Sequence, residues 1–258
     1  MRRDEPMRRD DPMRRDPAPG VTEDGCSVDV YARLPEVGEA AMVEAVAPPG
    51  SSVLDLGAGT GRIADPLADA GYDVVAVDSS AQMLDRVRRA ATVLGHIETL
   101  RLERRFDVVL LASHLVNTPD ASGRAALLAA VARHLNPAGV ALLEWHPPEW
   151  FEGLLAGRTY RGEIGPFATE LRVTSLVGGR LSATVSYTAR GERWEQAFTC
   201  RRLTASDMRT ACADAGLTAP TPVLGSAHWL RTTRIGPPEP GALNLPQEPS
   251  PRTGRTHS

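Results

Sequence analysis

The 258-residue sequence contains no lysine, and all 29 of its basic residues are arginine. An enzyme that forms a Schiff base needs a lysine amine, and a Walker-type nucleotide hydrolase needs the lysine of its phosphate-binding loop. The sequence therefore excludes both classes of enzyme.

Cysteine is also scarce. Cys26, Cys200 and Cys212 are odd in number and show no C-x-x-C spacing, which indicates reduced thiols rather than a disulfide framework or a metal site. No apolar run approaches the roughly 20 residues that cross a bilayer, and the N-terminus lacks the apolar core of a signal peptide. We therefore expect a cytoplasmic protein with no bound metal and no membrane partner.

Between the two ends of the chain, no segment is dominated by positive or by negative charge. The formal net charge is -3, and the arginines are scattered among carboxylates without a sustained basic face. This distribution argues against a nucleic-acid partner. The sequence gives no indication of the oligomeric state.

Both ends of the chain are poor in residues that could be buried. The sequence opens with a near-threefold repeat, MRRDEP, MRRDDP, MRRDPA, so translation could begin at Met1, Met7 or Met13. Residues 1–20 and 237–258 are predicted to be disordered tails, because neither can form a core. The folded domain is expected over residues 21–236.

Strand and helix patterns alternate through the first part of this domain. Strands are expected over residues 53–56, 72–77, 92–95, 106–112 and 140–145, and helices over residues 36–47, 62–70, 80–90 and 121–135, the last capped by Asp120. Strands separated by helices of this length predict a doubly wound α/β fold with a mostly parallel sheet.

The pattern changes after Trp145. Residues 168–203 carry apolar side chains at alternate positions, which predicts an inserted antiparallel meander over one end of the sheet. Thr204 and Asp207 then form a capping-box pattern at the start of another helix. A last pair of short strands is expected to end near Ile235.

The most informative segment is VLDLGAGTGRIA, residues 53–64, in which a buried strand runs into three alternating glycines. Glycine suits a sharp turn that a ligand must approach too closely for a side chain. Asp78 follows the next strand, 17 positions after Gly61. Since the carboxyl ends of adjacent parallel strands lie side by side, we expect Asp78 to face the turn and to hold the hydroxyls of a ribose.

Dinucleotide-binding enzymes share this plan but space their glycines as G-x-G-x-x-G. Arg62 occupies that third position here, and the glycines fall as G-x-G-x-G, with Asp55 two residues before the first. In this respect the sequence resembles the class I S-adenosylmethionine-dependent methyltransferases. Further segments of that family follow in order: VVAVDSSAQML (74–84), FDVVLLASHLVN (106–117), LNPAGVALLEW (135–145) and RLTASDMRTACADAGL (202–217).

The resemblance implies a Rossmann-like, seven-stranded methyltransferase fold with S-adenosylmethionine as cofactor. It places Gly57, Ala58 and Gly59 against the methionine portion, Asp78 at the ribose, and Gln82 or Met83 beside the adenine. The expected cofactor-binding set is completed by Tyr31, Asp55, Gly61, Ser79, His96, Ile97 and Ser113.

Two departures from the family pattern bear on the ligands. Gly95-His96-Ile97-Glu98 stands where many members have an Asp that contacts the adenine, which leaves the backbone of Ile97 for that contact. The loop ASHL after the fourth strand lacks both the Asn/Asp-Pro-Pro-aromatic motif and the cysteine of enzymes that methylate nucleobases. The expected acceptor is therefore a small molecule, of a kind that the sequence does not specify.

Methyl transfer needs a general base only for some acceptors, and two histidines are candidates for that role. His114 follows the fourth strand and His146 follows the fifth, both at the edge where the cofactor would lie. The alternative is that each is a loop histidine satisfied by backbone groups. Tyr31 is a candidate lid over the sulfonium or a packing residue, and Trp150 and Phe151 are more typical of a pocket wall.

Two other functions remain open at this point. A non-catalytic S-adenosylmethionine sensor or partner protein would share the same fold and motif. A nicotinamide-dependent oxidoreductase would share the strand, turn and acid, although Arg62 argues against it.

Overall fold

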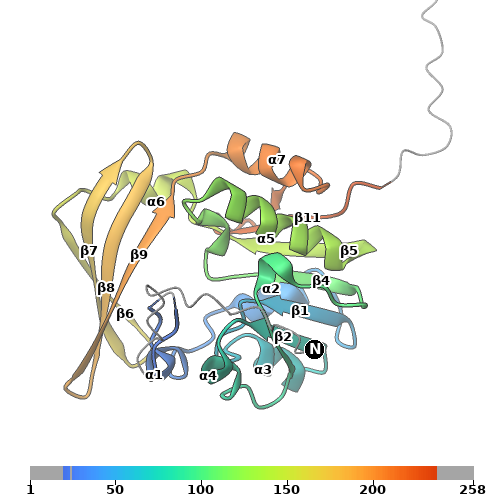
Figure 1. Ribbon diagram of the computed structural model, residues 1–258, viewed down its shortest axis with the longest axis horizontal. Coiled ribbons are helices and arrows are strands. Elements are labelled where there is room, and N and C mark those ends of the chain that lie inside the picture. Colours follow the sequence, from blue (N-terminus) through green and yellow to red (C-terminus); the bar gives the residue numbers. More distant parts are fainter. Residues whose placement is uncertain (1–19, 24, 237–258) are drawn as a thin grey trace, which may run out of the picture.

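A computed structural model of the chain describes residues 20–23 and 25–236 (Figure 1). The tails predicted over residues 1–20 and 237–258 lie outside this described part, apart from Gly20. Within the described part, no helix combines the length and the apolar character needed to span a bilayer. Cys26, Cys200 and Cys212 are buried, and within the described residues none of them forms a disulfide.

A seven-stranded sheet in the order β10-β11-β5-β4-β1-β2-β3 forms the centre of the fold. Five of its strands run parallel: β1 (Ser52–Leu56), β2 (Asp73–Asp78), β3 (Ala91–Leu94), β4 (Phe106–Leu111) and β5 (Leu135–Glu144). The short strands β10 (Thr221–Pro222) and β11 (Trp229–Thr232) add an antiparallel edge. This confirms the doubly wound, mostly parallel sheet.

The order of the strands places a crevice in the sheet. The chain runs from β1 outward through β2 to β3, and then returns to place β4 on the other side of β1. The strand order therefore reverses between β1 and β4, and ligands of open α/β sheets bind at such a point, outside the carboxyl ends of the strands.

Helices cover both faces of the sheet. They are α1 (Val28–Tyr31), α2 (Glu39–Glu44), α3 (Ala64–Asp69), α4 (Ala81–Leu84), α5 (Ala121–His134), α6 (Pro148–Glu152) and α7 (Ala205–Asp214), with 3₁₀ turns η1 (Ile97–Thr99) and η2 (Leu115–Asn117). The apolar core on one face includes residues of α5 and α7, and that on the other includes residues of α2 and α3. Asp120 caps α5, and Thr204 with Asp207 forms the predicted capping box of α7.

Two helices are about half as long as the sequence predicted, or less. The helix expected over residues 80–90 ends at Leu84, because the Asp65 carboxylate accepts the N–H groups of residues 88–90 that a continuing helix would use. The helix expected over residues 36–47 begins only at Glu39. Glu36 lies before it, and its carboxylate accepts the N–H groups of Gly38 and Ala40.

A separate four-stranded antiparallel sheet stands beside the central sheet, as Figure 1 shows. Its strands are β6 (Thr159–Ile164), β7 (Phe167–Val177), β8 (Arg180–Ala189) and β9 (Glu192–Arg201). The meander predicted over residues 168–203 thus has an additional first strand, β6. This strand pairs with β7 alone and is mostly exposed, so its sequence lacks the alternation of a half-buried strand.

Candidate functional site

A cavity of about 470 Å³ opens at the carboxyl ends of β1, β2 and β4, where the strand order reverses. Its floor is the glycine turn that follows β1, and its opposite wall includes residues from the segment around α1 and from β9. This volume lies within the range of pockets that hold small-molecule ligands and cofactors.

The glycine turn depends on conformations that other residues rarely adopt. Gly57 and Gly59 have φ angles of +77° and +56°, in the left-handed region. A Cβ atom on Gly57 would lie 2.7 Å from Cδ1 of Leu115, which also lines the cavity. The turn is fixed to β2, because the N–H groups of Gly57 and Ala58 both donate to the carbonyl oxygen of Val77, over 2.8 and 2.9 Å.

Asp78 is the last residue of β2, rather than the first residue beyond it as predicted, and its carboxylate faces the turn. Oδ2 accepts the N–H of Gly59 over 2.9 Å, and Oδ1 accepts the N–H of Ser80 over 2.8 Å. A carboxylate has about four acceptor positions, so further hydrogen bonds from a ligand remain possible at this edge of the cavity.

Asp55 is the most unusual group of the cavity. It lies on β1 with 1% of its surface exposed, and among the described residues neither of its carboxylate oxygens has a hydrogen-bond partner. Burial away from water raises the pKa of Asp55 to about 7, although the positive charge of Arg62 opposes this shift. A buried carboxylate without a partner, lining a cavity, suits a cationic group of a ligand.

Most of the residues that the sequence proposed for the cofactor line this cavity. They are Tyr31, Asp55, Gly57, Ala58, Gly59, Asp78, Ser79, Met83, His96, Ile97 and Ser113. Two of the proposed residues lie elsewhere. Gln82 is exposed, and its Oε1 accepts the N–H of Gly20 over 2.9 Å. Gly61 lines a neighbouring pocket instead.

Sequence reasoning missed several residues of the cavity wall. Thr22, Glu23 and Cys26 come from the segment before α1, and Gln196 comes from β9. Gln196 Nε2 donates to Cys26 Sγ over 2.9 Å, which links the segment before α1 to the antiparallel sheet. These residues are distant in sequence and belong to no motif, so no local signal could have identified them.

The two candidate histidines meet at the carboxyl edge of β4 and β5. Their rings stack with centroids 3.6 Å apart, and the ring of Trp150 stacks on the other side of His146 at 3.8 Å. His114 has a φ angle of +56°, and its Nε2 lies 3.6 Å from Oε1 of Glu144. The other oxygen of Glu144 accepts the N–H of Ser113 over 2.6 Å and so holds the strained turn.

Burial keeps both rings uncharged at neutral pH. Loss of hydration is the largest cause that lowers the pKa of His114 to about 4 and that of His146 to about 2. The Nδ1 atom of each ring is buried and has no hydrogen-bond partner in the part of the chain that the structure describes. The cavity wall includes Ser113 but neither histidine, so the stacked pair lies beside the cavity rather than within it.

Comparison with known proteins gives consistent matches. Residues 53–139 match the family model of a methyltransferase domain. The chain is 36% identical over 132 residues to cypemycin N-terminal methyltransferase from a Streptomyces species, covering 48% of this chain and 53% of that protein. It is 29% identical over 206 residues to dTDP-3-amino-3,6-dideoxy-alpha-D-glucopyranose N,N-dimethyltransferase from Streptomyces fradiae, covering 69% of this chain and 80% of that protein.

A solved structure shares the fold over most of both chains. It is that of an amino pentose methyltransferase from Micromonospora echinaspora with S-adenosylmethionine bound, which is 25% identical and has a TM-score of 0.60. The match covers 81% of this chain and 92% of that one. By contrast, the chain spans only about half the length of the first curated relative that it matches.

The reversed strand order, the glycine turn and the acid at the end of β2 define a Rossmann-like α/β protein with a ligand crevice at its switch point. Residues 53–139 are a methyltransferase domain by their family match, and the fold over most of the chain is similar to that of the class I S-adenosylmethionine-dependent methyltransferases.

Proposed function

We propose that the chain is an enzyme that binds S-adenosylmethionine in the switch-point cavity, transfers its methyl group to an amine of a small molecule, and releases S-adenosylhomocysteine. The observation that carries this proposal is the pair of carboxylates that flanks the glycine turn. Asp78 faces the turn with acceptor positions to spare, and Asp55 lies buried in the cavity wall without a partner.

The cavity residues fit the chemical groups of this cofactor. Asp78 would accept hydrogen bonds from the ribose hydroxyls, and Asp55 would pair with the ammonium group of the methionine portion. Met83 and Ile97 are buried apolar residues that would border the adenine. The turn at Gly57 lets the ligand approach the backbone, where a side chain would collide with Leu115.

An amine acceptor is favoured by the relatives. The names of these three relatives describe amino acceptors: an N-terminus, a 3-amino sugar nucleotide and an amino pentose. An amine attacks a methyl group only through an uncharged nitrogen, so its site should not stabilise an ammonium ion. The stacked rings of His114 and His146, both uncharged at neutral pH, meet that requirement.

The cofactor, when bound, supplies a methyl group that is already activated for in-line displacement. The chain then has mainly to hold the acceptor nitrogen in line and to exclude water. We assign to His114 and His146 the acceptance of a hydrogen bond from the amine N–H, which orients its lone pair. Glu144 is close to His114, and burial raises its pKa, so it can take up a proton more readily than an exposed glutamate.

Isothermal titration of the full chain with S-adenosylmethionine tests the cofactor. We expect saturable binding, and the absence of heat at millimolar ligand from folded protein would contradict the proposal. Release of S-adenosylhomocysteine across a panel of primary and secondary amines tests the reaction. Binding without release for any amine or hydroxyl acceptor would instead favour the non-catalytic sensor.

A further inference from the structure

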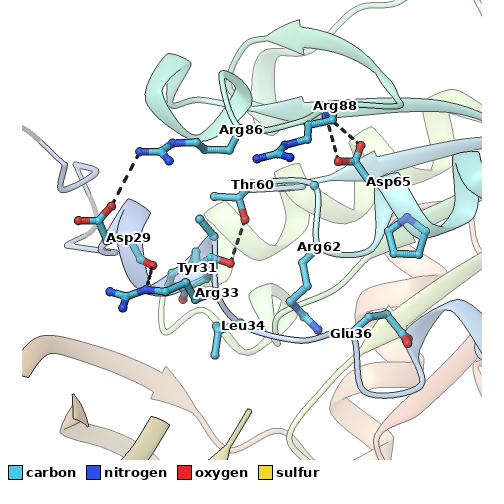
Figure 2. Close-up of a pocket in the computed structure, with 13 residues that line it drawn as sticks. Asp29, Tyr31, Arg33, Leu34, Glu36, Thr60, Arg62, Asp65, Arg86 and Arg88 are labelled. Carbon is cyan, nitrogen blue, oxygen red and sulfur yellow. Dashed lines mark hydrogen bonds and ion pairs between the residues drawn. The ribbon is translucent and has the colours of Figure 1, made fainter. Parts of the chain in front are cut away.

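A second pocket, of about 730 Å³, adjoins the cofactor cavity (Figure 2). The two share Tyr31, Thr60 and Arg62 in their walls, and the hydroxyl of Thr60 donates to the backbone oxygen of Tyr31 over 3.0 Å at their common boundary. The remaining wall comes from residues 29–36, from Gly61, from the start of α3, and from the loop after α4. The cofactor contacts proposed above do not involve this second pocket.

The loop after α4 presents two guanidinium groups to this pocket. In the part of the chain that the structure describes, the side chain of Arg88 makes no hydrogen bond or ion pair, whereas its backbone N–H is held by the Asp65 carboxylate over 2.9 Å. Arg86 has one weak partner, Asp29, at 3.8 Å, and the side chains of Arg86 and Asp29 are 52% and 63% exposed. Figure 2 shows both arginines along one rim of the pocket.

Two further arginines lie on the opposite side, and the protein holds both in place. Arg62 pairs with the buried Glu39. Arg33 donates from Nε to the backbone oxygen of Asp29 over 2.9 Å and lies 4.5 Å from the centre of the Trp194 ring. Arg62 and Arg33 are therefore already engaged by the protein, and Arg33 also lies 3.8 Å from a carboxylate oxygen of Glu192, whereas Arg86 and Arg88 contribute hydrogen-bond donors that a ligand can use.

The carboxylates of the pocket are less available than its arginines. The oxygens of Asp65 accept three backbone N–H groups, and Oε1 of Glu36 accepts two. Asp29 is the third carboxylate of the wall, and it faces Arg86. The unmet hydrogen-bonding capacity is therefore on the donor side, and the matching ligand is an anion with several acceptor oxygens.

We propose that this pocket binds the phosphate or diphosphate group of the methyl acceptor. Planar guanidinium groups pair with the oxygens of phosphate through two parallel hydrogen bonds, and two adjacent arginines suit a group with several oxygens. The two cavities meet at Tyr31, Thr60 and Arg62, so in this proposal the anionic group of the acceptor lies beside Arg88 and its amine lies on the cofactor side of that boundary. The inference rests on the proposed function, since it names a feature of the acceptor for that same site.

The first experiment uses inorganic diphosphate as the probe, titrated calorimetrically into the full chain in the presence of S-adenosylhomocysteine. We expect binding that weakens at least about tenfold in Arg88→Gln, equivalent to about 1.4 kcal/mol. Arg89→Gln is the matched control, because it removes the same charge one residue away from a side chain that pairs with Asp69 and does not line the pocket. Equal loss in both variants, or no binding to the wild type, would overturn the proposal.

The second experiment separates an acceptor group from a free phosphate effector. Amino sugars linked to a nucleoside diphosphate are compared with the same amino sugars without it, in wild type, Arg88→Gln and Arg89→Gln. We expect a KM for the linked form that rises about tenfold in Arg88→Gln only, with kcat preserved. Diphosphate binding without any advantage for the linked form would mean a free effector and would overturn the assignment to the acceptor.

Failure of the diphosphate site can be distinguished from failure of the proposed methyl transfer. Diphosphate binding is read as heat, with no need for turnover, so it reports on the arginine pocket even if no amine is methylated. Binding of S-adenosylmethionine to Arg88→Gln should equal that of the wild type, because Arg88 does not line the cofactor cavity.

Discussion

The backbone N–H of Gly59 donates to Oδ2 of Asp78 over 2.9 Å, so the turn after β1 is tied to the end of β2 before any ligand arrives. The bond fixes one carboxylate oxygen, and the N–H of Ser80 fixes the other. Groups held in position by the fold lose little conformational freedom on binding, which favours affinity. The proposed ribose contact at Asp78 is therefore preorganised.

Replacing Asp78 with asparagine should weaken binding of S-adenosylmethionine by at least about 1 kcal/mol, because a charged acceptor of hydrogen bonds is lost. Calorimetric titration measures the change. Asp73→Asn is the control, since Asp73 begins the same strand at its other end and its carboxylate pairs, among the described residues, only with the exposed Arg104. Unchanged affinity in Asp78→Asn would show that the ribose lies elsewhere.

The sequence was sufficient to predict those parts of the site that depend on neighbours along the chain. The glycine turn and Asp78 follow from one strand-turn-helix unit and the strand after it, and parallel pairing of β1 with β2 then brings them together. The helix caps at Asp120 and Thr204 could also be predicted, because they too depend only on neighbouring residues in the sequence. The sequence predicted that either Gln82 or Met83 would lie beside the adenine. In the structure Met83 lines the cavity and Gln82 does not, because successive residues of α4 face different directions.

Long-range contacts account for what the sequence could not predict. The end of α4 at Leu84 depends on the carboxylate of Asp65, which belongs to the preceding helix. The bond from Gln196 to Cys26 joins residues 170 positions apart. The carboxylate of Asp55 lacks a partner among the described residues because it is buried among neighbours on several elements. The residue types along one strand do not predict such an environment.

Asp55 should make the stability of the ligand-free protein depend on pH. Burial raises its pKa from 3.8 to about 7, so its contribution to stability is full below pH 3.8 and is lost as the pH rises toward 7. Asp55→Asn removes this titration while keeping the shape of the side chain. We expect the gain in unfolding free energy of Asp55→Asn over the wild type to grow between about pH 4 and 7 and then to stay constant.

Denaturant unfolding at several pH values measures this difference. The same substitution should abolish or greatly weaken binding of S-adenosylmethionine, because the neutral amide cannot pair with its ammonium group. A substitution that stabilises the protein but weakens ligand binding is expected where a binding site contains an unfavourable buried charge. A gain that does not vary with pH would mean that Asp55 is not the titrating group.

Gly57→Ala should destabilise the fold and narrow the cofactor cavity. The φ angle of +77° is strained for alanine by about 1–3 kcal/mol. The added Cβ would also collide with Leu115. In the double variant with Leu115→Ala the collision is relieved and the strain remains, so its loss of unfolding free energy should be smaller than the sum of the two single losses.

Gly153→Ala serves as the control for that experiment, because a Cβ on Gly153 meets no atom within 4 Å and its φ angle of -80° is ordinary. Chemical denaturation gives the free energies, and calorimetry gives the affinity for S-adenosylmethionine. Strict additivity of the two substitutions would show that Leu115 does not restrict the turn.

The ring nitrogens of His146 can be tested apart from its packing. His146→Phe keeps an aromatic ring between His114 and Trp150 but removes both nitrogens, whereas His146→Ala also removes the stacking. If the ring accepts a hydrogen bond from the acceptor, His146→Phe should lower kcat by about 100-fold. Its affinity for S-adenosylmethionine should not change, since His146 does not line the cofactor cavity.

The pH profile gives a second readout of the same role. The pKa of His146 is lowered to about 2 and that of His114 to about 4, so neither ring gains a proton between pH 6 and 8. Turnover of the wild type should therefore show no loss from histidine protonation in that range. Full activity in His146→Phe together with loss in His146→Ala would instead mean that this residue only supports the aromatic stack.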